Sequence, residues 1–169
     1  SRPQARRCLI CGGPVTVCSR SRAHGLAAIQ AKTEDILWSF AAGHLAQLAR
    51  QALEDEVCLT PKPGLVDRRN TGAHDDMDLP LFHRSAAALE PYFCRFVSLG
   101  MAGASPAELQ ALGREAEHAM LTATGGVNTH KGALYSFTLL LSALGRSLTE
   151  GGDPFHTAAA IAAALPPAS

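Results

Sequence analysis

Helical periodicity is the feature of this sequence that most constrains its fold. From Thr33 onward apolar residues recur every three or four positions, and no stretch alternates apolar and polar residues for long enough to predict a strand. The composition agrees, because 47% of the residues are hydrophobic, many of them alanine, and only 5% are aromatic. We therefore expect an all-α protein, a multi-helix bundle with two polar loops and a short cysteine-rich N-terminal tail.

The ends of the helices follow from their flanking residues. We expect the first helix to begin at Thr33 as its N-cap and to end before Pro61, because a residue before proline avoids the helical region. Its expected apolar stripe contains Ile36, Leu37, Phe40, Ala41, Leu45, Leu48, Ala49 and Leu53. Later helices are expected over residues 81–100, with a kink or break at Pro91, from a capping box at Ser105 and Glu108 to about residue 124, over 134–148, and from Asp153 to before Pro166.

The first polar loop, residues 60–78, reads TPKPGLVDRRNTGAHDDMD. Asp75, Asp76 and Asp78 form a cluster of hard oxygen ligands of the kind that binds Mg²⁺ together with substrate phosphates. Lys62 and Arg68, with Arg69 beside it, supply contacts for anions. A solvated loop with Asp–Arg pairs, each contributing about 0 to 1 kcal/mol, remains an equally open interpretation.

The second polar loop, residues 124–136, reads TGGVNTHKGALYS. It places Asn128, Thr129, His130 and Lys131 at the start of a helix, where free backbone N–H groups favour phosphate. It is not a Walker A loop, because Gly132 follows the lysine where that motif has Ser or Thr. An ordinary turn with a polar cap is the alternative. His74, His83 and His130 are candidate acid/base groups, or else capping and core residues.

Three of the five cysteines lie near the N-terminus as Cys8, Cys11 and Cys18, and His24 follows them. The two-residue separation in CLICGGP, with its Gly-Gly-Pro turn, is typical of a loop that brings two thiolates to one Zn²⁺. Three reduced cysteines packed in a short hairpin are the alternative. We expect Cys58 and Cys94 to be buried thiols.

Charge and hydropathy limit the partners. Residues 1–25 carry five arginines and no acid, so the remainder holds ten bases against fifteen acids. A basic zinc-knuckle module that binds nucleic acid is therefore one hypothesis, although the tail has no aromatic side chain for base stacking. No apolar run reaches the ~18 residues of a membrane helix, and the start lacks the apolar core of a signal peptide. We expect a cytoplasmic protein with no membrane contact.

Two segments, LTPKPGLVDRRNTGAHDDMDLPLFHRSA and TATGGVNTHKGALYSFTLLLSALGR, resemble the two N-terminal signature segments of the triphosphoribosyl-dephospho-CoA synthase family. The resemblance covers roughly residues 33–165. The opening RCLICGGPVTVCSRSRAHG is similar to the C-terminal end of the phosphoribosyl-dephospho-CoA transferase of apo-citrate lyase, which some bacteria fuse in front of the synthase. The resemblance thus implies a transferase tail at residues 1–25 and an incomplete, N-terminal part of the synthase at residues 33–169. We expect such a part to be inactive alone.

The resemblance implies a reaction and a set of roles. The ribose 2′-hydroxyl of 3′-dephospho-CoA attacks C1′ of the ATP ribose and expels adenine, which gives the prosthetic-group precursor of citrate lyase and a functional link to its acyl carrier protein. A nucleotide N-glycoside hydrolase would use water instead. The implied catalytic candidates are His74, His130 and Asp67. The implied metal ligands for Mg²⁺ are Asp76, with Asp75 or Asp78, and the implied contacts to ATP and its phosphates are Lys62, Arg68, Asn70, Asn128, Thr129, Lys131 and Gly132.

Overall fold

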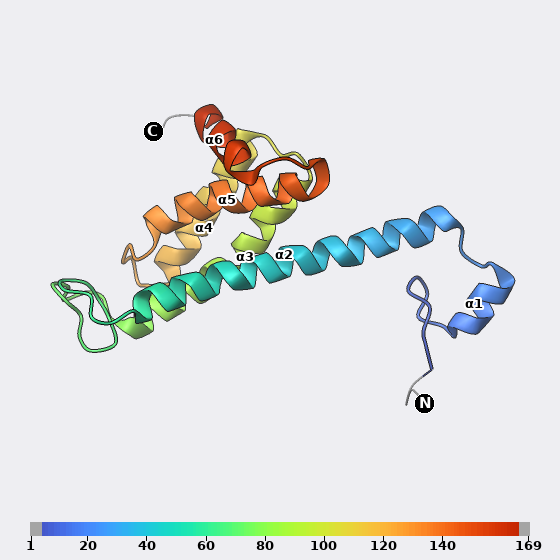
Figure 1. Cartoon of the computed structure of the whole chain (residues 1–169). Helices are drawn as coiled ribbons and strands as arrows, with labels where there is room; N and C mark the ends of the chain where they lie inside the picture. Colours follow the sequence, from blue (N-terminus) through green and yellow to red (C-terminus); the bar gives the residue numbers. More distant parts are fainter. Residues whose placement is uncertain (1–4, 166–169) are drawn as a thin grey trace. The chain divides into compact units, whose positions relative to one another are not determined.

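The computed structural model describes residues 5–165, which form six α-helices and no strand (Figure 1). The prediction of an all-α protein is confirmed. Within these residues the chain divides into a first unit up to Ala41 and a second unit from Ala42. None of the helices between residues 5 and 165 is long and apolar enough to cross a membrane. The helices are α1 (Val15–Ser21), α2 (Leu26–Cys58), α3 (Leu79–Met101), α4 (Pro106–Ala123), α5 (Lys131–Glu150) and α6 (Pro154–Ala164).

The core of the second unit lies where α3, α4 and α5 pack together. Phe93 and Phe96 of α3 are fully buried, as is Met120 of α4. The Phe93 ring lies 5.1 Å from the ring of Phe137 on α5. Aromatic side chains of this size dominate the burial of apolar area, so α3 is the central helix of this unit.

Two glycines let α3 and α5 approach until their backbones touch. A Cβ atom on Gly100 of α3 would lie 2.0 Å from the carbonyl oxygen of Ser142. A Cβ atom on Gly145 of α5 would lie 2.1 Å from the carbonyl oxygen of Val97. Both distances are far below van der Waals contact, so the crossing requires glycine at both positions.

The sequence signals at the starts of α4 and α6 are confirmed. Ser105 and Glu108 form the reciprocal capping box that opens α4, and the Asp153 carboxylate accepts a hydrogen bond from the N–H of Phe155 at the start of α6. Helix α3 runs through Pro91 without a break. Pro91 has no N–H to donate to the carbonyl of Ala87, and both residues are exposed, so the carbonyl that loses its helical partner lies on the solvent side of α3.

The expected start and apolar face of the first long helix are wrong. Helix α2 begins at Leu26, and Thr33 lies inside it with its hydroxyl donating to the carbonyl of Ile29 at 2.8 Å. Phe40 is 71% exposed, and Ile36, Leu37 and Leu48 are exposed as well. The buried face of α2 consists of Ala42, Ala46, Ala49, Leu53 and Val57, so only Ala49 and Leu53 of the expected stripe are buried. Three of these five buried side chains are alanines. A prediction that looks for large apolar side chains at helical spacing therefore places most of the buried face of α2 on the wrong side of the helix.

Candidate functional site

The first polar loop is organised around one buried carboxylate. Asp67 is 4% exposed, and its Oδ2 accepts a hydrogen bond from the N–H of Lys62 at 3.0 Å. Its Oδ1 accepts from the N–H groups of Arg69 at 2.7 Å and Asn70 at 3.1 Å. The backbone N–H groups of Arg69 and Lys62 hold the pKa of this carboxyl below its usual range. Asp67 therefore stays ionised and joins the backbone of Lys62 to that of Arg69 and Asn70.

Two glycines bring the arms of this loop into contact. Gly64 and Gly72 have φ values of +79° and +62°, which favour glycine. A Cβ atom on Gly72 would lie 2.5 Å from the carbonyl carbon of Gly64. The side chain of Asn70 accepts a hydrogen bond from the N–H of Gly72 at 2.8 Å. The loop is thus a built structure with a defined backbone.

The loop acids differ in their surroundings. Asp78 is the N-cap of α3 and accepts from the N–H of Leu81 at 2.8 Å. Asp75 and Asp76 are exposed and make no hydrogen bond or ion pair with other residues in the described range 5–165. In that range the three carboxylates do not gather into a three-ligand metal group. Asp75 and Asp76 therefore remain open to an ion that brings other ligands with it.

The second loop is joined to α3 through a buried chain of polar groups. The Thr129 hydroxyl donates to the Ser85 hydroxyl at 2.6 Å, and Ser85 Oγ lies 2.7 Å from Nδ1 of His130. Since Ser85 accepts from Thr129, its own proton is directed at Nδ1, which leaves Nε2 as the protonated nitrogen of the ring. The ring of Phe82 meets that of His130 edge to face at 5.1 Å. The two polar loops therefore lie at the same end of α3 (Figure 1).

His130 is held neutral. Its side chain is 6% exposed, and burial lowers the pKa of the imidazole to about 4, with the negative charge of Glu56 opposing the shift. Its Nε2 is buried and has no hydrogen-bond partner within residues 5–165. A buried N–H without a partner is costly, so this atom is a point at which a ligand acceptor gains a hydrogen bond.

The two lysines of the loops are each paired with a glutamate. Lys62 Nζ lies 2.9 Å from Glu56 of α2, and Lys131 Nζ lies 2.8 Å from Glu117 of α4. The Asn128 side chain accepts from the N–H of Lys131 at 3.2 Å. Each ammonium group therefore already holds an anionic oxygen.

The remaining candidates are more open. His74 is half-buried, while Arg68 and Gly132 are exposed, and a Cβ atom on Gly132 would meet no atom within 4 Å. The sequence did not single out Ser85, Glu56 or Glu117 as functional. For Ser85 a signal was present, because a serine on the apolar face of α3 requires a buried hydrogen-bond partner. For Glu56 and Glu117 the sequence contains no such signal, because their ion pairs with Lys62 and Lys131 depend on how the helices pack.

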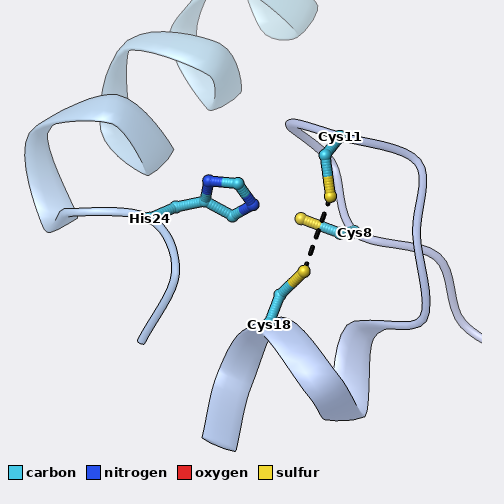
Figure 2. A group of neighbouring side chains, drawn as sticks. All are labelled: Cys8, Cys11, Cys18 and His24. Atoms are coloured by element: carbon cyan, nitrogen blue, oxygen red, sulfur yellow. Dashed lines mark hydrogen bonds between the residues drawn. The ribbon is translucent and has the colours of Figure 1, made fainter. Parts of the chain in front are cut away.

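A separate group of side chains lies in the first unit (Figure 2). The ligand atoms of Cys8, Cys11, Cys18 and His24 all lie within 4.8 Å of one another, so these four residues can hold a metal ion. The backbone N–H groups of Cys11 and Ile10 lower the pKa of the Cys8 thiol to about 6. The hydrogen bond with Cys11 raises the pKa of the Cys18 thiol to about 11.

The fold and the loops define an all-α protein with two polar loops at one end of its helical unit and a cysteine–histidine group in a small first unit. Residues 42–166 match the ATP:dephospho-CoA triphosphoribosyl transferase family, CitG, and the chain belongs to this family. Residues 2–40 match a second family, the apo-citrate lyase phosphoribosyl-dephospho-CoA transferases, CitX. The family resemblance predicted from the sequence is confirmed.

Curated relatives agree. The chain is 41% identical over 152 residues to the protein CitXG of Haemophilus influenzae. This match covers 86% of the present chain and 33% of the relative. It is 42% identical over 147 residues to the 2-(5''-triphosphoribosyl)-3'-dephosphocoenzyme-A synthase of Haemophilus ducreyi. This match covers 81% of the present chain and 45% of the relative. The chain thus spans less than half the length of these relatives. No solved structure matches it.

Proposed function

We propose that this chain serves the transfer of a triphosphoribosyl group from ATP to the 2′-hydroxyl of 3′-dephospho-CoA, with release of adenine. The observation that carries the proposal is the family match over residues 42–166, which contains both polar loops. In this transfer the 2′-oxygen forms a bond to C1′ of the ATP ribose, and the bond from C1′ to the adenine nitrogen breaks. The acceptor hydroxyl loses a proton, adenine gains one, and the triphosphate stays intact. The product is the prosthetic-group precursor that citrate lyase receives on its acyl carrier protein.

The triphosphate binds between the two loops in this proposal. Its oxygens replace the carboxylates of Glu56 and Glu117 as partners of Lys62 and Lys131, since both ammonium groups already hold an anionic oxygen at 2.8–2.9 Å. Arg68 is exposed in the first loop and adds a further cation. Asn128 and Thr129 hold the start of α5, where backbone N–H groups favour a phosphate oxygen.

Mg²⁺ fits the exposed acids of the first loop. Asp75 and Asp76 present hard oxygen ligands with no partner in the described range 5–165, whereas the carboxylate of Asp78 caps α3. Asp76, with Asp75 beside it, would hold the ion. When bound, Mg²⁺ supplies charge neutralisation and orientation for the triphosphate.

The proton transfers need one base and one acid near C1′. His130 is neutral at physiological pH, and its buried Nε2–H is a hydrogen-bond donor rather than a strong base. His74, a half-buried residue of the first loop, is the candidate for the second role. Asp67 positions the loop, and Asn70 is the exposed neighbour available to a ribose hydroxyl.

Binding of ATP tests this proposal directly. With Mg²⁺ present, the 169-residue chain is expected to bind ATP with a dissociation constant on the order of 0.1 to 1 mM. Asp76→Asn and Lys131→Ala are each expected to weaken binding by roughly ten-fold, about 1.4 kcal/mol. Isothermal titration calorimetry with and without Mg²⁺ gives the constants, and the circular-dichroism signal checks the fold.

Matched variants separate the site from general charge effects. Asp153→Asn keeps an N-capping side chain at α6, and Lys32→Ala removes a lysine of the first unit, so both should bind ATP like the parent. Equal affinities for all four variants would refute the assignment of the loops. Adenine release that occurs with water and needs no 3′-dephospho-CoA would instead indicate a nucleotide hydrolase.

A further inference from the structure

We propose that Cys8, Cys11, Cys18 and His24 form a closed structural Zn²⁺ site that holds the first unit together. The four side chains come from three consecutive pieces of chain: a tight turn, helix α1, and the link between α1 and α2. Figure 2 shows all four directed toward a common centre. The site is independent of the proposed transfer reaction.

The turn that carries the first two cysteines is built by short hydrogen bonds. The N–H of Cys8 donates to the carbonyl of Gly13 at 2.7 Å, and the N–H of Gly12 donates to the carbonyl of Cys8 at 2.9 Å. Gly12 has a φ of +71°, which a residue with a side chain rarely adopts. This geometry places both sulfur atoms on one side of the turn, as zinc knuckles require.

The other two ligands are positioned by the end of α1. Cys18 lies in α1, and its carbonyl accepts the N–H of Ala23 at 3.2 Å. Arg22 adopts a left-handed conformation as the C-cap, which turns the chain back toward the cysteines. His24 lies two residues after Arg22, and its Nε2 is buried with no hydrogen-bond partner in the described part of the chain. A metal ion satisfies this nitrogen.

The spacing of the ligand atoms suits Zn²⁺. Tetrahedral ligation with Zn–S bonds of about 2.3 Å places sulfur atoms about 3.8 Å apart. The sulfur atoms of Cys11 and Cys18 are 3.5 Å apart, and all four ligand atoms lie within 4.8 Å of one another. Three thiolates and one imidazole are a ligand set that selects zinc over hard cations such as Mg²⁺.

The first unit also needs such a site. No residue between 5 and 41 is buried as a whole, and Leu9, Val17 and Leu26 are all exposed. The cysteines are free thiols rather than disulfides. A small unit without an apolar core is usually held by disulfides or by a metal, so a metal is the remaining link. Four protein ligands leave no open position, which assigns the ion a structural role.

Metal analysis tests the inference. The full chain, purified under reducing conditions and dialysed, is expected to carry about one equivalent of zinc. Replacing the zinc by Co²⁺ should give the visible bands of tetrahedral cobalt and a thiolate charge-transfer band in the near ultraviolet. Cys11→Ser is expected to weaken zinc binding by more than about 100-fold, because even changes outside the ligand set cost about 10- to 100-fold.

Two further variants protect the test against misfolding. Cys94→Ser changes a cysteine of α3 outside the group and should keep the full zinc content. His24→Cys replaces one zinc ligand by another and should keep the zinc while shifting the cobalt spectrum. A parent protein that takes up neither zinc nor cobalt while its thiols are reduced would overturn the site. So would a His24→Cys protein with an unchanged cobalt spectrum, because His24 would then not be a ligand.

Discussion

Gly145→Ala tests the close crossing of α3 and α5. The added methyl group would lie 2.1 Å from the Val97 carbonyl oxygen and 3.0 Å from the Met101 nitrogen. Both are backbone atoms that cannot rotate away, so the helices must separate by about 1 Å at their centre. Overpacking of this kind costs about 1 to 3 kcal/mol, and the higher helix propensity of alanine returns at most about 1 kcal/mol. We expect a net loss of about 2 kcal/mol in the free energy of unfolding.

Urea denaturation followed by circular dichroism measures this loss, and the melting temperature should fall by about 4 to 8 °C. Gly113→Ala in α4 is the matched control, because its Cβ would meet no atom within 4 Å. That variant should be as stable as the parent, or up to about 1 kcal/mol more stable. The double variant Gly100→Ala/Gly145→Ala should lose less free energy of unfolding than the two single variants together. The first methyl group already separates the helices, so the second costs less. Equal stability of Gly145→Ala and Gly113→Ala would refute the close crossing.

Two further predictions concern the loops. Burial lowers the pKa of His130 to about 4, so between about pH 6.5 and pH 4 the unfolded chain binds a proton at this residue that the folded chain does not. The free energy of unfolding is therefore highest above about pH 6.5 and decreases as the pH falls toward 4. Between about pH 7 and pH 5 the loss should be about 1 to 2 kcal/mol, and a His130→Gln protein should lack it in urea titrations at each pH. Asp67→Asn should open the first loop, because an amide cannot accept all three N–H bonds of the carboxylate. Trypsin should then cleave faster after Arg68 and Arg69 than in an Asp55→Asn control, and an unchanged cleavage rate would argue against the anchoring role of Asp67.

Local signals explain why most of the fold was predictable from the sequence. The capping box at Ser105 and the Asp153 cap are encoded within a few residues, and both are present in the structure. The start of α2 was misjudged because a threonine with acids after it looks like a cap, while nothing before Thr33 breaks the helix. The alanine face of α2 depends on which neighbours pack against it, and that information is not local.

The candidate site shows the same division. Both loops stood out by composition, and CxxC spacing indicated a metal site before the structure placed His24 beside the thiols. The pairing of Lys62 with Glu56 and the buried contact of Ser85 with His130 join residues far apart in the chain. No pattern within one segment specifies such contacts, because they arise from the tertiary packing of the helices.

The Asp67 carboxylate has a consequence for the dynamics of its loop. The three amide protons that it binds, on Lys62, Arg69 and Asn70, have no secondary structure to shelter them. Their exchange with solvent is governed by one event, the departure of a single side chain, so the three amides should exchange at a common opening rate. The segment between Lys62 and Asn70, although irregular in its backbone, should therefore open and close as one cooperative unit.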